Sequence, residues 1–570
     1  MKILRPLINR ARRVTLPVSA LILSLSSSLA FAAADTVIRY GKIYTMDPQK
    51  PWADAIAIEK GKITYVGGLN GVKKHIGNKT KVINLYDTDF VIPGLHDVHL
   101  HPLEAGSENI GCAVNTNKGV DHWLKTIKGC AKQGNGWLLG AGFYIGTLLE
   151  DGRNPVAALD KISKTRPIAI METTSHAVWV NSKALEKIGF TPNTPNPPGG
   201  HIGKLANGKL SGLLLDTAGD MAFHAALNNP STAQKQRDYE GLLYSLKQIR
   251  KYGITSIANA RVYWKRGYLD AWYRAREEGK LTARSTLGLW LYPEDINDAA
   301  QVDALAGMYD DSDDMLKVTE VKTYDDGITI NTTAAMKKPY LKDLGVGLES
   351  DKGLNYLTES RLTYYVSELE KIGFNMHIHA IGDRGVHESL NAIETAMDIN
   401  GNIGRDRRHR LTHLEYISKS DVPRFDELNV VADMQVAGDW TLPGHVSKEE
   451  QELLGNRIKR QIPMRELYDA NATVTLSSDW DVSTLSPYIG MMHSLQRGNQ
   501  SLPNRKAALE AYTINGAYAL RQDHLVGSLK VGKRADITIV DRNLMTVPVK
   551  DVGKAKTVMT IVDGKTVYSL

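Results

Sequence analysis

Short apolar runs of strand length alternate with longer amphipathic segments through the middle of this chain. Helical periodicity, with apolar residues three or four positions apart, covers residues 231–251, 359–372, 385–400 and 505–521. Eight strand-like runs accompany them, at residues 95–101, 254–262, 285–291, 318–324, 376–381, 410–416, 430–436 and 474–480. Strands that alternate with helices form parallel sheets, and eight such strands can close a barrel. The pattern therefore predicts a distorted (β/α)8 TIM-type barrel over residues 90–524.

Both ends of the chain have another pattern, with short strands separated by glycine-containing turns. It covers residues 36–90 and returns at residues 527–568. We expect residues 34–89 and 525–570 to form one small β-sandwich domain beside the barrel. Two further strand-like runs lie between the first and second barrel strands, and we interpret residues 106–240 as an inserted domain.

The first 32 residues differ from the rest of the chain. A basic start precedes an apolar run at residues 16–29, which ends in Ala30-Phe31-Ala32. This order is typical of a secretory signal peptide, here cleaved after Ala32. The run is short and rich in serine, so we expect no stable membrane anchor. Arg12-Arg13 also has the character of a twin-arginine export signal, and we predict a periplasmic or secreted protein.

Removing this segment changes the charge balance of the chain. The full sequence of 570 residues has a formal charge of +7, but five basic and no acidic residues lie in residues 1–32, which leaves +2. No basic run follows, so we expect a small-molecule substrate and no nucleic-acid partner; a homo-oligomer is compatible with the sequence. The two cysteines, Cys112 and Cys130, predict one disulfide in an oxidising compartment, with two buried free thiols as the alternative.

Histidines stand at the carboxyl end of the first predicted barrel strand. Alternate residues of a strand share a face, so Asp97, His99 and His101 point one way and His96 points the other. Two imidazoles two residues apart can reach one metal ion, although a half-buried strand with surface histidines has the same pattern. Active sites of α/β barrels lie at this end of the strands.

Four further polar residues stand at the ends of other predicted barrel strands. They are Lys322, His379, His413 and Asp479. Each has a structural explanation when taken alone, as a lysine that reaches solvent, a hydrogen-bonded core histidine or a helix-capping aspartate. A barrel directs the carboxyl ends of its strands to one point, so we expect these residues to meet the two histidines there.

The order of these motifs resembles the amidohydrolase superfamily, specifically amidohydrolase family 3, whose members include N-substituted formamide deformylases. The resemblance covers essentially all of the chain after the signal peptide. Its motifs are Pro93-Gly-Leu-His-Asp-Val-His-Leu-His101, Val321-Lys322 with Asp326-Gly327, His379-Ala-Ile-Gly-Asp383, His413-Leu-Glu415, Ser478-Asp479-Trp480 and, near the end, Gly527-Ser-Leu-Lys-Val-Gly-Lys-Arg-Ala-Asp536.

This resemblance implies a metal-dependent hydrolase with two divalent ions, expected to be zinc. His99, His101 and Asp479 would hold the first ion, His379 and His413 the second, and a carboxylated Lys322 would bridge them. Metal-activated hydroxide would attack the substrate, and Asp479 would accept its proton and return it to the leaving amine. A single-metal site, with Lys322 paired to Asp325 or Asp326, is the alternative.

The expected reaction is hydrolysis of a non-peptide amide or related carbon–nitrogen bond in a small molecule. Deaminases, lactonases and carbamate hydrolases share this machinery, and an inactive binding or sensor protein that retained the fold is the alternative from another class. His377 shares a strand face with His379, and the family pattern favours His379 as the ligand. The candidate substrate-binding residues are His176, Asp326, His377, Trp480 and Arg497, with Trp137, Trp179 and Trp440 as further pocket candidates.

Overall fold

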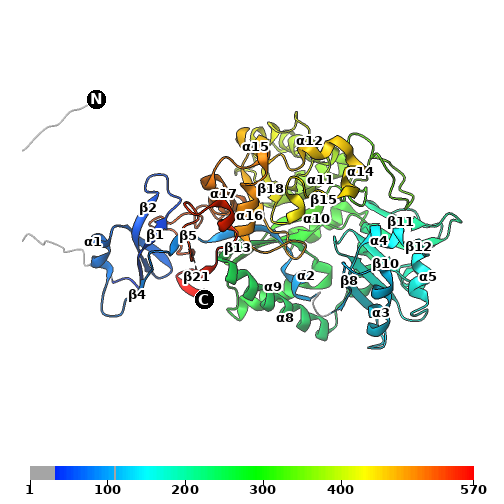
Figure 1. The fold of residues 1–570 in the computed structure, drawn as a ribbon, viewed down its shortest axis with the longest axis horizontal. Helices are drawn as coiled ribbons and strands as arrows, with labels where there is room; N and C mark the ends of the chain where they lie inside the picture. Colours follow the sequence, from blue (N-terminus) through cyan, green and yellow to red (C-terminus); the bar gives the residue numbers. More distant parts are fainter. Residues whose placement is uncertain (1–32, 108–110) are drawn as a thin grey trace, which may run out of the picture.

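A parallel sheet of eight strands forms the centre of the protein. The computed structural model describes residues 33–107 and 111–570, so the predicted signal peptide lies outside the described residues (Figure 1). The strand order is β19-β18-β17-β16-β15-β14-β13-β6, and a parallel bridge between Leu100 and Trp480 joins the two edges. The predicted barrel is confirmed. Its strands are β6 (Leu95–Leu100), β13 (Ile254–Val262), β14 (Arg284–Trp290), β15 (Leu316–Tyr324), β16 (Asn375–Ala380), β17 (Arg410–His413), β18 (Val431–Gln435) and β19 (Val474–Ser477).

Helices cover the outside of the barrel and bury its apolar outer face. Leu287, Val318 and Ile378 from the strands and Leu369 and Leu390 from the helices belong to one large core. Burial of each such side chain contributes about 1.5–3 kcal/mol. The helices of this region are α2 (Pro102–Ser107), α8 (Thr232–Ile249), α9 (Tyr268–Glu277), α10 (Asp298–Ala306), α11 (Glu359–Ile372), α12 (Asp383–Asn400), α13 (Arg424–Glu427), α14 (Lys448–Leu454), α15 (Met464–Asp469) and α16 (Pro487–Ser494).

The helix predicted over residues 505–521 is instead two short helices, α17 (Arg505–Ala511) and α18 (Ile514–Ala519). The helical hydrogen-bond pattern is interrupted between them because the carbonyl of Tyr512 accepts the backbone N–H of His96, at 2.8 Å. The sequence prediction failed here because the competing partner is a distant strand. None of the helices in the described part of the chain is long and apolar enough to cross a membrane.

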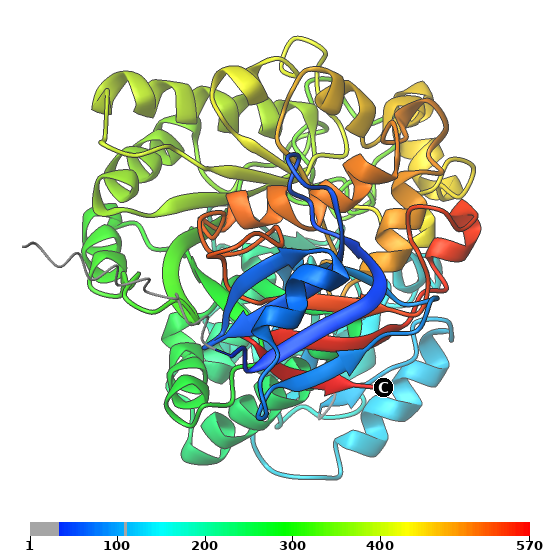
Figure 2. The ribbon, with the colours of Figure 1, turned by 90° about the vertical axis from the view of Figure 1, so that its left-hand side faces the viewer.

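Strands from both ends of the chain form a second sheet, as predicted. All eight strands are hydrogen-bonded into one mixed sheet, with a register shift in β1 between Arg39 and Ile43. Figure 2 shows strands from the start and the end of the chain side by side. The elements are β1 (Thr36–Tyr44), β2 (Trp52–Glu59), β3 (Lys62–Gly67), β4 (Lys81–Asn84), β5 (Phe90–Pro93), β20 (Ile537–Val540), β21 (Thr557–Val562) and β22 (Lys565–Ser569), with the short helices α1 (Leu69–Val72) and α19 (Val549–Val552).

This flanking sheet is attached to the amino ends of the barrel strands. Gly94 links β5 to β6, and its backbone N–H donates to the carbonyl of Asp536 at 2.9 Å. A side chain at Gly94 would lie 2.0 Å from the Thr255 hydroxyl, so only glycine fits. The buried guanidinium of Arg284 donates twice to the Asp536 carboxylate, at 2.7 and 3.1 Å. The carboxyl ends of the barrel strands therefore remain available for a site.

The inserted segment forms a third sheet at the other end of the molecule (Figure 1). Its order is β11-β12-β10-β9-β8-β7, and Trp123 and Trp179 are fully buried in its core. The sulfurs of Cys112 and Cys130 are bonded, which confirms the predicted disulfide. The elements are β7 (Cys112–Ala113), β8 (Leu138–Phe143), β9 (Ile168–Glu172), β10 (Ala177–Val180), β11 (Gly200–Lys204) and β12 (Leu210–Asp216), with α3 (Val120–Cys130), α4 (Ile145–Glu150), α5 (Pro155–Asp160), α6 (Ser182–Ile188) and α7 (Thr217–Leu227).

Candidate active site

Closure of the barrel brings the first and last strands together at their carboxyl ends. The backbone N–H of Asp479 donates to the carbonyl of His99 at 2.9 Å, and that of His101 donates to the carbonyl of Trp480 at 2.6 Å. As a result, Nε2 of His99 and Nε2 of His101 lie 3.2 and 3.0 Å from Oδ1 of Asp479. One potential ligand atom from each residue lies within 4.8 Å of the other two, a spacing suitable for one metal ion.

The other predicted ligands extend this cluster across the mouth of the barrel. The ring centroid of His413 is 5.1 Å from that of His99 and 4.3 Å from that of His379. Tyr324 stacks on His379 at 4.3 Å, and Nζ of Lys322 lies 5.1 Å from the Tyr324 ring. Five strands therefore supply the side chains of one continuous polar site.

Local backbone geometry turns two of these side chains toward the site. His413 and Asp479 have φ values of 78° and 51°, in the left-handed region that non-glycine residues rarely adopt. Such a conformation costs about 1–3 kcal/mol and persists only where surrounding contacts enforce it. For Asp479 these contacts include the hydrogen bond to His99, and for His413 the next N–H, of Leu414, donates to Ala380 at 3.0 Å.

Burial lowers the pKa of several basic groups of the site. It lowers the pKa of His413 to about 3 and that of His99 well below its usual value. Burial also lowers the pKa of Lys322 well below its usual range. Burial alone would raise the pKa of Asp479, but the neighbouring His99 and His101 reverse this and hold it well below normal. Neutral imidazoles beside a carboxylate are the protonation states that bind metal ions.

The free atoms of these residues fit a metal centre. Three buried nitrogens of the site have no hydrogen-bond partner among the described residues, namely Nδ1 of His101, Nδ1 of His379 and Nζ of Lys322. Buried polar atoms are normally paired, because an unpaired one costs free energy. Imidazole nitrogens and a carboxylate are the donors that zinc and related divalent ions prefer. The donor set therefore fits a metal centre.

His377 lies behind His99 and supports it. Nε2 of His377 is 3.0 Å from Nδ1 of His99, while Nδ1 of His377 is 3.3 Å from Glu320 and 2.8 Å from Arg410. A guanidinium can only donate, so Nδ1 of His377 accepts from Arg410 and the proton of His377 lies on Nε2, where Nδ1 of His99 accepts it. Nε2 of His99 then faces Asp479, and His377 holds the ring in this orientation from behind.

His176 is the inserted domain's contribution to the site. Its ring lies 5.2 Å from that of His379 and 5.4 Å from that of Tyr324. Nδ1 of His176 lies 2.7 Å from Oδ1 of Asp216, which also accepts a hydrogen bond from Tyr356 at 2.9 Å. This anchor positions the His176 ring beside the predicted metal ligands.

Other predicted substrate-binding residues have structural partners. The buried Asp326 carboxylate accepts the backbone N–H groups of Ala335, Ile381 and Gly382, at 2.7–2.9 Å. Arg497 is buried and donates to the carbonyls of Thr441 and Gln461. These contacts fix the loops around the site.

The predicted tryptophans have different environments. Trp179 is fully buried in the inserted domain, and Trp137 packs on a second core of that domain. Trp480 is partly buried in the segment that closes the barrel. Trp440 is 46% exposed and lines a pocket beside His413 and Asp479.

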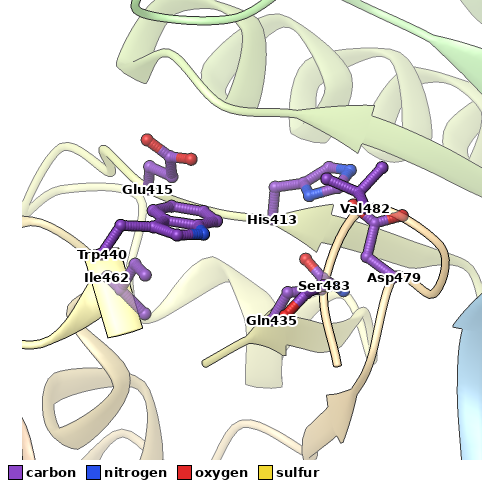
Figure 3. A pocket seen from close by; sticks show the side chains of 8 residues that line it. All are labelled: His413, Glu415, Gln435, Trp440, Ile462, Asp479, Val482 and Ser483. Atoms are coloured by element: carbon purple, nitrogen blue, oxygen red, sulfur yellow. The ribbon is translucent and has the colours of Figure 1, made fainter. Parts of the chain in front are cut away.

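This pocket contains residues that the sequence did not single out as substrate-binding. Figure 3 shows Glu415 and Trp440 on one side, Asp479 on the other, and His413 and Gln435 between them. Glu415 belongs to the His413-Leu-Glu415 motif, and Gln435 stands at the end of a barrel strand, so both positions carried a signal. Ile462, Val482 and Ser483 form the remaining wall. They lie in loops, where no sequence pattern indicates a role in the pocket.

Comparisons with known proteins agree with this geometry. A family model described as "Amidohydrolase family" matches residues 82–568. The Arabidopsis thaliana protein LONG AFTER FAR-RED 3 is 27% identical, over 94% of this chain and 92% of its own length. The N-substituted formamide deformylase of Arthrobacter pascens is 26% identical, over 93% of this chain and 97% of its own length.

Solved structures show the same fold. The crystal structure of an uncharacterized metal-dependent hydrolase from Pyrococcus horikoshii superposes with a TM-score of 0.69, covering 90% of this chain and 99% of its own, at 20% identity. The family model spans the barrel, the inserted sheet and the part of the flanking sheet that follows β3. The chain therefore belongs to the amidohydrolase family and is a hydrolase.

Proposed function

We propose that this enzyme hydrolyses a non-peptide amide, or a closely related carbon–nitrogen bond, in a small molecule. The observation that carries the proposal is the convergence of His99, His101 and Asp479 with His413 and His379 at the mouth of the barrel. The similarity to a protein named N-substituted formamide deformylase also supports an amide substrate. An inactive binding protein that retained the fold is less consistent with a complete set of buried donors.

His99, His101 and Asp479 would hold one divalent ion, and His379 and His413 a second. Such ions acidify water and polarise a substrate carbonyl. The Asp479 carboxylate lines the pocket next to these imidazoles and is held as an anion, so it can take a proton and return it to a leaving nitrogen. Glu415, on the side of the pocket away from Asp479, and Gln435, between the two sides, supply further polar groups for the substrate.

We also propose that Lys322 is carboxylated and bridges two ions, with zinc as the preferred metal. Nζ of Lys322 is fully buried, and no carboxylate of the described residues pairs with it. Asp326 accepts backbone N–H groups and Asp325 accepts from Asn355, so neither forms the pair with Lys322 that the single-metal alternative needs. A neutral amine can form a bond to the carbon of carbon dioxide and lose a proton, which gives an anionic carbamate with two oxygen donors.

Metal content tests the proposed centre. Wild-type protein loaded with zinc should contain two ions per chain, and Lys322→Ala should lose at least one ion and most activity. Formate or acetate with excess metal should partly restore the activity of Lys322→Ala by replacing the carbamate oxygens. One ion per chain in loaded wild-type protein, with no rescue of the variant, would rule out the bridge. No stoichiometric ion at all would favour the inactive binding protein.

A substrate screen tests the reaction class. Formamides, N-acyl amines, N-acyl amino acids, lactones and carbamates should be compared with the zinc-loaded protein and after chelation. We expect chelator-sensitive cleavage of formamides or N-acyl amines to exceed cleavage of lactones. Cleavage of lactones or carbamates alone would replace the amide proposal.

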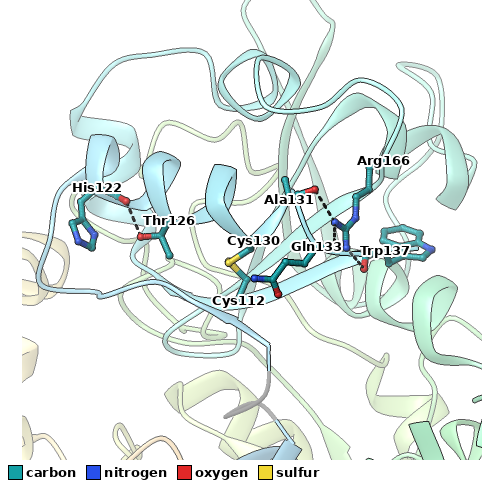
Figure 4. The surroundings of a disulfide bond; sticks show 8 residues. All are labelled: Cys112, His122, Thr126, Cys130, Ala131, Gln133, Trp137 and Arg166. Atoms are coloured by element: carbon teal, nitrogen blue, oxygen red, sulfur yellow. Dashed lines mark hydrogen bonds between the residues drawn. A yellow bond between two sulfur atoms is a disulfide. The ribbon is translucent and has the colours of Figure 1, made fainter. Parts of the chain in front are cut away.

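We further propose that the protein is exported after loss of residues 1–32. The disulfide between Cys112 and Cys130 supports this, because such bonds persist in oxidising compartments. It joins β7 to the end of α3, near carbonyls that accept hydrogen bonds from Arg166 (Figure 4). Amino-terminal sequencing of the mature protein from its native cell should begin at Ala33. A mature protein that begins at Met1 would contradict export through cleavage.

A further inference from the structure

The pocket beside Asp479 and His413 contains a buried acceptor with no partner. Gln435 is 5% exposed, and its Oε1 has no hydrogen-bond partner in the described part of the chain. Its Nε2 lies 2.8 Å from the Asp433 carboxylate and 2.7 Å from the Ser477 hydroxyl. A carboxylate can only accept, so the amide nitrogen must face Asp433. Oε1 is thereby fixed as a free acceptor in a residue that lines the pocket.

Glu415 adds a carboxyl group to the same pocket. It is 9% exposed, and it accepts a long hydrogen bond from Gln461, at 3.4 Å. Among the described residues, no basic side chain forms an ion pair with it. A second carboxylate, Glu450, lies behind and accepts from Tyr416 at 2.8 Å and from Gln461 at 2.9 Å. The nearby Arg497 donates its hydrogen bonds to backbone carbonyls, so it acts on Glu415 by its charge and not through a hydrogen bond.

The remaining walls suit a nitrogen cation carried on a short apolar chain. Ile462 and Val482 line the pocket, and the exposed indole of Trp440 lies beside Glu415 (Figure 3). Indole faces attract ammonium and guanidinium groups. Buried carboxylates without a protein cation are stabilised by a cationic partner. The pocket therefore offers two side-chain acceptors, Oε1 of Gln435 and the Glu415 carboxyl group, beside the Ser483 hydroxyl and the indole N–H.

We propose that this pocket binds a protonated amine or guanidine of the substrate, which donates to Oε1 of Gln435 and pairs with Glu415 while Trp440 covers it. The proposal deepens the proposed function, because the cation would be joined by a short alkyl chain to the amide held at His413 and Asp479. The substrates would be mono-acylated diamines or similar amides with a basic group.

A matched substrate pair tests this specificity. N-formyl-1,4-diaminobutane carries an ammonium where N-formylpentylamine carries a methyl group of similar size. Zinc-loaded wild-type enzyme should have a kcat/KM at least tenfold higher for the amine. Glu415→Gln should remove most of this preference through a higher KM for the amine only. Glu450→Gln, which changes a neighbouring carboxylate that does not line the pocket, should keep it.

Binding measured without turnover separates this inference from the proposed reaction. Calorimetric titration of the zinc-loaded protein with pentylamine and with pentanol should give at least tenfold tighter binding of the amine. Trp440→Leu and Glu415→Gln should each reduce that difference. Equal binding of the two probes by wild-type protein, or an undiminished preference in Glu415→Gln, would overturn the inference. Amine-selective binding without hydrolysis of any formamide would support the pocket and refute the formamide reaction.

Discussion

At the scale of single residues, Asp479 combines two demands that usually conflict. As a ligand it must remain an anion, and as a proton carrier it must exchange a proton during turnover. Its position 3.2 and 3.0 Å from two imidazoles lowers its pKa and satisfies the first demand. Its place in the pocket wall gives it access to the substrate, which the second demand requires.

Replacing Asp479 with asparagine tests this double role. The amide keeps a similar shape but cannot accept the proton, so kcat should fall by about 10²–10⁴-fold with little change in KM. His99 and His101 should still retain part of the metal. Steady-state kinetics and metal analysis of the same preparation check both statements. Near-normal turnover by Asp479→Asn would show that another group carries the proton.

The predictable residues of the site were those on strands. His99, His101, Lys322, His379, His413 and Asp479 were identified because each ends a barrel strand, and the structure brings them together. Ile462 and Ser483 could not be identified from the sequence, because their position in the pocket wall depends on the packing of extended loops. Arg497 is a predicted substrate-binding residue, and its partners in the structure are backbone carbonyls that no local pattern reveals.

At the scale of secondary elements, buried polar contacts hold helix α11 against the start of β17. Glu370 on α11 is 1% exposed and accepts hydrogen bonds from Arg407 at 2.9 Å and Asn400 at 2.6 Å. His409 lies 3.2 Å away, and its Nδ1 accepts the N–H of Met376, so its Nε2 carries the proton that Glu370 accepts. Burial would raise the pKa of Glu370, but these donors lower it to about 2.

Removing this carboxylate should weaken the fold in a pH-dependent way. The lowered pKa means that Glu370 stabilises the fold above its unfolded value of 4.5 and loses this effect as the pH falls toward about 2. At pH 7, Glu370→Gln should cost about 3 kcal/mol, or about 3 °C in melting temperature for a chain of this length. The difference from wild type should shrink between pH 5 and pH 2.

Scanning calorimetry at several pH values measures this difference. Glu368→Gln is the matched control, because Glu368 lies on the same helix but pairs with Lys371 at the surface. The control should lower the melting temperature by less than about 1 °C at every pH, as expected for a surface pair. A Glu370→Gln deficit that does not change with pH would mean that the effect comes from packing alone.

The disulfide belongs to the same scale, since it ties β7 to the end of α3. Its Cα atoms are 6.0 Å apart, within the usual range for a disulfide. Replacing both cysteines with serine should destabilise the inserted domain by at most about 3 kcal/mol, because the bond closes a short loop. Limited proteolysis should then cut the inserted domain faster than the barrel. Thiol labelling of denatured, unreduced protein provides the check, and two reactive thiols per wild-type chain would exclude the bond.

At the scale of the whole molecule, the sequence predicted the architecture because each level of pattern agreed with the next. Strand and helix periodicity, the Gly94 link and the paired ends of the chain all specify the same arrangement. The sequence did not show how the parts meet. The Arg284–Asp536 pair and the approach of His176 to His379 join residues that are distant along the chain.

Closure of the barrel makes the predicted metal centre part of the fold. The edge strands β6 and β19 meet through few backbone contacts, and the side chains that would share an ion lie on both of them. An ion bound only to the folded state stabilises that state by an amount that increases with metal concentration.

Zinc should therefore raise the melting temperature and slow hydrogen exchange at the amides of His101 and Asp479. Amides of β2 and β3 in the flanking sheet, far from the site, are the internal control and should exchange at unchanged rates. Equal protection of both regions, or of neither, would show that the ion does not close the barrel.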